Sequence, residues 1–148
     1  MSALAVLIDT DVLIDFLIDR EPFTKAAKDL VQKVQENKIE AFLAAHSITN
    51  IFYILRKIYS IKERKQILID LCQTISIIGI KPESVLRALL NNDFDDFEDC
   101  LQSECAMAVN ADYIITRNVQ DYSHSEIPAL LPEQLLKKLA PTENSSMP

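Results

Sequence analysis

The chain has 148 residues, 49% of them hydrophobic, which is enough for one domain with a substantial buried core. Fifteen basic and 22 acidic residues give a net charge of −7, which excludes nucleic-acid binding by bulk attraction, although a local basic surface stays possible. Gly79 is the only glycine, which excludes the glycine-rich loops of P-loop and dinucleotide-binding proteins. No apolar run approaches the ~18 residues of a membrane span, and the first residues lack a basic signal-peptide opening. We therefore expect a soluble, cytoplasmic protein.

Hydrophobic periodicity predicts strands and helices in alternation along the chain. We expect strands at residues 3–8, 41–44, 76–80 and 113–116, with a short fifth strand near 129–131. Helices are expected at 11–17, 23–36, 47–59, 62–75 and 82–90, from the acidic stretch 93–99 through 110, and at 132–139. This alternation predicts an α/β fold, a single three-layer α/β/α domain over residues 1–140 with a mainly parallel sheet of four to five strands. The polar segment 141–148 is expected to be a disordered tail.

Oxygen-bearing side chains follow several predicted strands, at the point where each strand ends. Ligands of open α/β sheets bind beyond these carboxyl ends, so we expect the side chains to converge. They are Asp9 and Asp11 after the first strand, Asn50 after the second, Asp99 in the helix leading to the fourth, and Asn118 and Asp121 after the fourth. Clustered carboxylates repel one another unless a cation is bound, and oxygen ligands select Mg²⁺ or Mn²⁺. The sequence therefore predicts a metal site suited to phosphodiester hydrolysis.

Three segments resemble the motifs of the PIN domain family. Residues 6–15 (VLIDTDVLID) are similar to its opening strand and turn, and residues 97–102 (FEDCLQ) to its acidic motif at a helix start. Residues 113–122 (YIITRNVQDY) resemble its closing motif, and the three occur in the family's order. The resemblance implies a metal-dependent ribonuclease acting on single-stranded or structured RNA. It also implies a homodimer, often the toxin partner of an antitoxin protein.

The same resemblance assigns roles to individual residues. Asp9 and Asp99 match the metal-binding aspartates, and Asn118 stands where many members have a third. Asp121 is then an auxiliary catalytic carboxylate near them. Four further residues are expected to contact and orient these metal-binding and catalytic side chains: Asp11, Asn50, Asp96 and Thr116.

Asn50 departs from the family pattern, because the helix after the second strand usually supplies a glutamate there. Asparagine keeps a carbonyl oxygen but loses the charge, which lowers the expected metal affinity unless Asp11 or Asp96 compensates. An alternative function is therefore a catalytically weak PIN-like module that binds RNA or protein. Asp9-Thr10-Asp11 also resembles the nucleophile motif of haloacid-dehalogenase-type phosphatases, but the stiff, β-branched Val12 that follows argues against it.

Several candidates also have simpler interpretations. Asp11 and Asp96 suit helix N-caps, as Ser47 does for the helix at 47–59. Thr116 and Asn118 are typical of a turn. Three further polar residues are expected to be structural: Asp15 in solvent or behind the site, Glu98 on a solvated helix start, and His46 as a hydrogen-bonded histidine.

A basic stretch interrupts this acidic chain. Five basic residues surround Glu63 and are a candidate contact for RNA phosphates: Arg56, Lys57, Lys62, Arg64 and Lys65. A solvated helical hairpin explains the same residues. The apolar residues beside them predict either core or a homodimer face: Phe52, Tyr53, Leu55 and Ile58.

Overall fold

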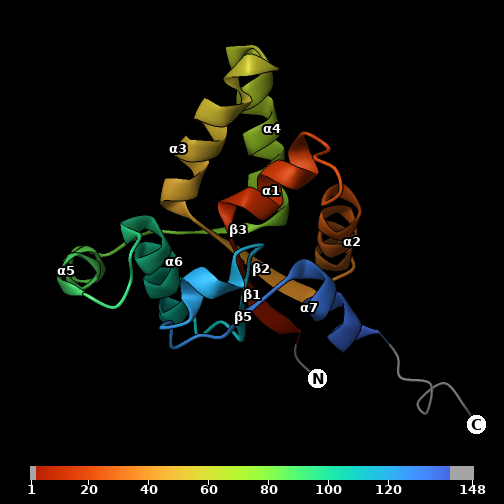
Figure 1. The fold of residues 1–148 in the computed structure, drawn as a ribbon. Coiled ribbons are helices and arrows are strands. Elements are labelled where there is room, and N and C mark those ends of the chain that lie inside the picture. Colours follow the sequence, from red (N-terminus) through yellow and green to blue (C-terminus); the bar gives the residue numbers. More distant parts are fainter. Residues whose placement is uncertain (1–2, 141–148) are drawn as a thin grey trace, which may run out of the picture.

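In a computed structural model of the protein, which describes residues 3–140, five parallel strands form one sheet in the order β3-β2-β1-β4-β5 (Figure 1). The strands are β1 (Leu4–Ile8), β2 (Ile39–Ala44), β3 (Ser76–Ile78), β4 (Tyr113–Ile115) and β5 (Ala129–Leu130). Every pair of neighbours in the sheet is parallel. The predicted parallel α/β architecture is confirmed, while the tail predicted at 141–148 lies outside the described residues.

Helices connect these strands. They are α1 (Thr10–Leu17), α2 (Thr24–Gln35), α3 (Ala45–Ile54), α4 (Ile61–Thr74), α5 (Pro82–Leu90), α6 (Phe97–Ala108) and α7 (Pro132–Leu139), with short 3₁₀ helices η1 (Leu55–Lys57) and η2 (Val119–Tyr122). Within residues 3–140, no helix has the length and apolar character needed to cross a membrane.

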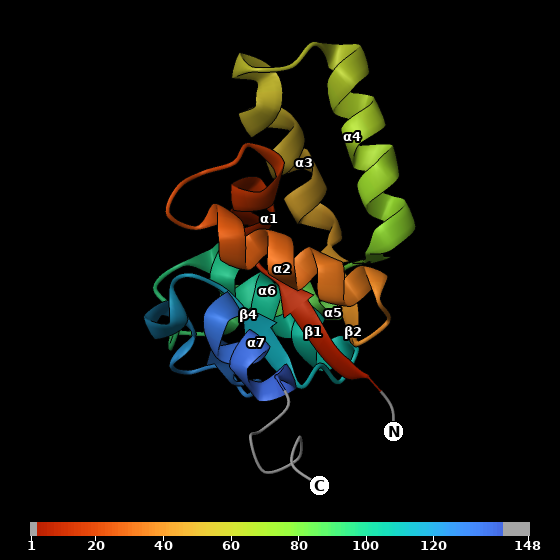
Figure 2. The ribbon, with the colours of Figure 1, turned by 90° about the vertical axis from the view of Figure 1, so that its right-hand side faces the viewer.

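Successive side chains of β1 point to opposite faces of the sheet, and helices cover both faces. Val6 and Ile8 enter a core formed with α1, α2, α4 and α7, whereas Leu7 packs with α6 on the other face. Helix α5 lies outside α6 (Figure 1), and α2 lies against α7 (Figure 2). These contacts produce the three predicted layers.

Helices α3 and α4 form an arm that extends beyond the carboxyl ends of the strands (Figures 1 and 2). The helix predicted at 47–59 begins earlier and ends at Ile54, because a 3₁₀ turn with buried Leu55 redirects the chain. Ser60 then starts α4 through a reciprocal capping box with Glu63. The arm rises directly beside the end of the sheet where polar residues were predicted to meet.

Two of the three predicted N-caps are wrong. Helix α1 starts at Thr10 with Asp9 in the capping position, so Asp11 lies in the first turn instead. Ser47 lies inside α3, where its hydroxyl accepts a hydrogen bond from Thr10. Asp96 is confirmed as the N-cap of α6, since its side chain accepts the backbone N–H of Asp99.

Candidate active site

The candidate site is a cleft at the carboxyl edge of the sheet, where strand order reverses. The chain runs from β1 to β2 and β3 on one side of β1, and then crosses to β4 and β5 on the other side. Such a switch point leaves space for ligands at the carboxyl ends of the strands. The cleft encloses about 400 Å³. It is lined by Asp9, Thr10, Asp11, Asn50, Tyr53, Ile54, Asp96, Glu98, Asp99, Asn118 and Asp121. The structure thus brings together all the predicted carboxylates and amides.

Asp9 lies deepest in this group, with 8% of its surface exposed. Its Oδ2 accepts a hydrogen bond from the Thr116 hydroxyl at 2.8 Å and one from the Tyr122 hydroxyl at 3.3 Å. Burial raises the pKa of Asp9 to about 6, with a smaller push from Asp11, and the Thr116 hydrogen bond opposes this rise. The side chain is therefore directed into the cleft and held from behind.

Thr116 connects Asp9 with the loop that follows β4. Its buried hydroxyl donates to Asp9 and accepts the backbone N–H of Asn118 at 3.0 Å. The turn predicted from Thr116 and Asn118 therefore also fixes a candidate metal ligand. Thr116 lies behind the site, as expected for a supporting residue.

Asp99 is half-buried in the first turn of α6. Burial, the largest cause, and the charges of Asp96, Asp9 and Asp121 together raise its pKa to about 7. The Tyr122 hydroxyl lies 3.3 Å from Asp99 Oδ1 and the same distance from Asp9 Oδ2. One hydroxyl proton is shared between two carboxylates, so negative charge in this part of the cleft is incompletely compensated.

Asn50 is paired with a residue that the sequence placed in solvent. Its amide nitrogen donates to Glu98 Oε1 at 2.9 Å, and both side chains line the cleft. Glu98 is partly buried, and burial, together with the charge of Asp96, raises its pKa. The solvated interpretation of Glu98 is wrong, because α6 turns this first-turn residue toward α3.

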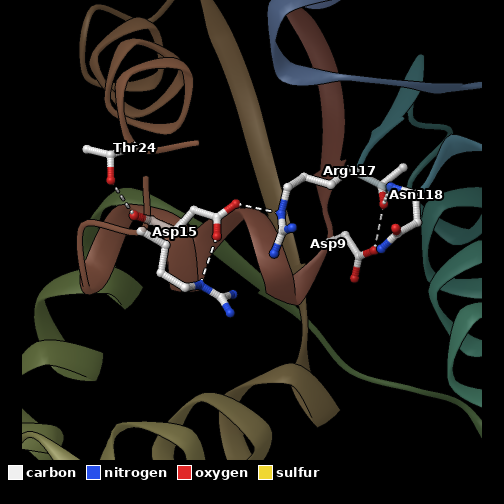
Figure 3. A network of polar contacts seen from close by, with 7 residues as sticks. Asp9, Asp15, Thr24, Arg117 and Asn118 are labelled. Carbon is white, nitrogen blue, oxygen red and sulfur yellow. Dashed lines mark hydrogen bonds and ion pairs between the residues drawn. The ribbon is translucent and has the colours of Figure 1, made fainter. Parts of the chain in front are cut away.

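An ion-pair network centred on the buried carboxylate of Asp15 lies behind the cleft (Figure 3). Asp15 in α1 forms ion pairs with Arg20, 3.0 Å from its Nε, and with Arg117, 2.8 Å from its Nε, and 2% of the Asp15 side chain is exposed. The Arg117 guanidinium also lies over the Phe23 ring, 4.1 Å from its centroid. Arg117 directly precedes Asn118, so this network fastens the loop after β4 to α1. A solvated Asp15 is thus excluded.

A second polar network ties three helices together below the cleft. The Thr10 hydroxyl donates to Ser47 Oγ at 2.8 Å, and Gln102 Nε2 donates to the same oxygen at 3.0 Å. All three residues are buried. They link α1, α3 and α6, the helices that carry Asp11, Asn50 and Asp99.

Other sequence-based interpretations meet mixed outcomes. Within residues 3–140, neither ring nitrogen of His46 has a hydrogen-bond partner, so the hydrogen-bonded histidine was wrong, and burial lowers its pKa. Leu55 belongs to the core, which was one of the two alternatives for the apolar residues of this segment. The side chains of Tyr53 and Ile58 are 61% and 57% exposed. Tyr53 lines the cleft, and the Arg56 guanidinium lies 3.6 Å from its ring centroid.

The basic residues fall into two groups. Arg64 is bound to the arm, donating to the Phe52 carbonyl at 2.9 Å and lying over the Phe52 ring. The remaining four are exposed, namely Arg56, Lys57, Lys62 and Lys65. Arg64 therefore stabilises the arm, and the exposed Arg56 is also held against it, because it donates to the Tyr53 carbonyl at 2.8 Å. The three lysines present their charge to solvent.

Three contributors to the site were missed from the sequence: Tyr122, Glu98 and Arg117. The sequence contained one indication of the Arg117 network. Asp15 interrupts the apolar run of α1, and a charge in such a run needs a partner of opposite charge. Tyr122 and Glu98 gave no comparable signal.

The donor set fits a divalent ion. Burial, and to a smaller extent the neighbouring carboxylates, raises the pKa values of Asp9 and Asp99, and a bound cation would favour the charged form of both. Across residues 3–140, no three carboxylate, thiolate or imidazole groups are close enough to form a complete cage. Mg²⁺ is commonly held by one or two carboxylates and several waters, which agrees with this arrangement.

Known proteins share both the sequence pattern and the fold. Ribonuclease VapC1 of Aquifex aeolicus (strain VF5) is 26% identical over 145 residues, covering 93% of this chain and 97% of that protein. DNA-bound VapBC from Salmonella typhimurium has a TM-score of 0.65 at 10% identity, over 87% of this chain and 98% of that one. A toxin–antitoxin complex from Klebsiella pneumoniae has a TM-score of 0.63 at 21% identity, over 86% and 97%. A family model described as a PIN domain matches residues 5–120, and the chain accordingly belongs to the PIN domain family.

Proposed function

We propose that the protein is an endoribonuclease that hydrolyses RNA phosphodiester bonds with Mg²⁺ or Mn²⁺ in the cleft. The observation that carries this proposal is the pair Asp9 and Asp99, joined by one Tyr122 hydroxyl at the switch point of the sheet. The relative from Aquifex aeolicus, matched over nearly its whole length, is named a ribonuclease, which supports the same activity.

Asp9, Asp99 and the side-chain oxygen of Asn118 would hold the ion. A bound divalent ion lowers the pKa of a water molecule and stabilises the charge that develops on a phosphate. Thr116 keeps the Asp9 carboxylate directed into the cleft and fixes the backbone of Asn118 at the same time. Asp121, which is exposed at the cleft wall, would accept a proton from an attacking water.

Activity tests this proposal directly. Asp9→Ala and Asp99→Ala should each reduce cleavage of a labelled single-stranded RNA pool by about 10³-fold, since several kcal/mol of metal-derived stabilisation is lost. Cleavage by the unaltered protein should require Mn²⁺ or Mg²⁺ and stop with excess chelator. Asp70→Ala, which removes an exposed carboxylate on α4, is the matched control and should cut normally.

Circular dichroism must first show that each variant is folded. A folded protein that binds RNA but does not cut it with any metal would contradict the nuclease. That result would support the alternative, a PIN-like binding module.

The exposed basic residues of the arm are proposed to contact RNA phosphates. Replacing Lys57, Lys62 and Lys65 together by alanine should weaken RNA binding and reduce the slope of log K against log salt by about 2, or ~0.7 for each phosphate contact. Fluorescence anisotropy between low and moderate salt measures both quantities. Lys137→Ala/Lys138→Ala on α7 removes two lysines elsewhere, and an equal effect from that variant would contradict the assignment.

A protein partner is also proposed. Exposed apolar side chains gather on the arm, namely Tyr53, Ile54, Ile58, Ile61 and Ile69. Such a surface favours contact with protein, either a second copy or an antitoxin. The toxin–antitoxin complexes among the similar structures support an antitoxin as the regulatory partner, and light scattering will show whether the protein alone is a homodimer.

A further inference from the structure

Asn50 and Glu98 form a complementary pair across the cleft. They come from different helices, α3 and α6, and are joined by a 2.9 Å hydrogen bond from the amide nitrogen to a carboxylate oxygen. The amide donates to one oxygen of Glu98, so it orients the carboxylate. Both side chains line the cleft that contains Asp9 and Asp99.

The pair explains why position 50 is neutral in this chain. A glutamate at 50 would bring a second carboxylate against Glu98, and two carboxylates at hydrogen-bonding distance repel strongly. An asparagine there removes the repulsion and supplies a donor. The negative charge that α3 lacks is therefore present in the cleft, on α6.

We propose that Glu98 is the carboxylate that helps to hold the divalent ion where α3 provides none, with Asn50 as its positioning residue. This inference rests on the proposed function. Glu98 would add its negative charge by hydrogen bonding to the groups that hold the ion, in the cleft that it shares with Asp9 and Asp99. Carboxylates that hydrogen-bond to a metal's ligands are known to contribute about 10–100-fold to metal affinity.

Binding of Mn²⁺ to the purified protein, without RNA, tests the role of Glu98. Electron paramagnetic resonance of the free ion provides the dissociation constant. Glu98→Gln keeps an oxygen that can accept the Asn50 hydrogen bond but removes the charge, so the affinity should fall about tenfold or more. Glu83→Gln is the matched control, because Glu83 occupies the same second position in α5 outside the cleft, and its affinity should match wild type.

Exchanging the two positions tests the pairing itself. In Asn50→Glu/Glu98→Gln the charge moves to α3, and the glutamine amide can donate to the new carboxylate. This double variant should recover most of the affinity that Glu98→Gln loses. Recovery would not occur if Glu98→Gln acted only by disturbing the start of α6.

The outcomes separate this inference from the proposed function. Absence of Mn²⁺ binding by the unaltered protein would overturn the metal-dependent function as well as the role of Glu98. Normal binding that Asp99→Asn abolishes, with Glu98→Gln equal to Glu83→Gln, would overturn only the role of Glu98. Weakened binding in Glu98→Gln without recovery in the double variant would overturn the pairing with Asn50.

Discussion

Asp15→Ala is expected to lower the free energy of unfolding by about 1–3 kcal/mol, because it leaves the partly buried Arg117 guanidinium without its partner. The Asp15 carboxylate is 2% exposed and pairs with two arginines, and only 23% of the Arg117 side chain reaches solvent. Urea denaturation followed by circular dichroism gives the difference. Because Arg117 fastens the loop that carries Asn118, the same variant should also bind Mn²⁺ less tightly.

The matched control for this variant is Asp29→Ala. Asp29 pairs with Lys25 one helical turn away on the exposed face of α2, at 2.8 Å. An exposed pair of this kind contributes about 0.5 kcal/mol or less. Equal decreases in the free energy of unfolding of the two variants would show that the buried ion pairs of Asp15 stabilise the fold no more than an exposed pair does.

In the absence of divalent metal, stability is expected to fall as the pH rises from 4 to 7. The pKa of Asp9 is raised from 3.8 to about 6, so in this interval the folded protein holds a proton that the unfolded chain has released. Stability contributed by such a group is complete below 3.8 and is lost as the pH rises through about 6. The shift corresponds to about 3 kcal/mol for Asp9, and the raised pKa of Asp99 acts in the same direction.

Comparison with Asp9→Asn isolates this contribution. The variant cannot titrate at position 9. As the pH rises, its free energy of unfolding should therefore fall less than that of the unaltered protein. Chemical denaturation of both in chelator, at several values from pH 4.5 to 7.5, measures the divergence. Parallel curves would contradict the raised pKa, and Mn²⁺ should restore stability only in the unaltered protein.

Much of this architecture could be predicted from local patterns in the sequence. Apolar runs such as Val6–Ile8 define the strands, and helical periodicity defines most helices to within a few residues. Parallel strands place their carboxyl ends at one edge, so topology alone predicts that Asp9, Asp99 and Asn118 meet. The resemblance of three motifs to the PIN domain family is confirmed by the family match over residues 5–120.

The pairing of polar side chains was decided by the tertiary structure. Glu98 looked like one member of a solvated acidic run, and only the approach of α3 to α6 makes it the partner of Asn50. Tyr122 contacts both Asp9 and Asp99 because η2 packs against α6.

Local sequence therefore determined the elements, their order and the edge where oxygen ligands gather. Tertiary packing decided which charges are neutralised and by which partner. Asp15 shows why, since nothing in its neighbourhood along the chain indicates that Arg117, 102 positions later, will bind it. Periodicity reports which face of an element is apolar, whereas an ion pair or hydrogen bond depends on the placement of two elements to within an ångström.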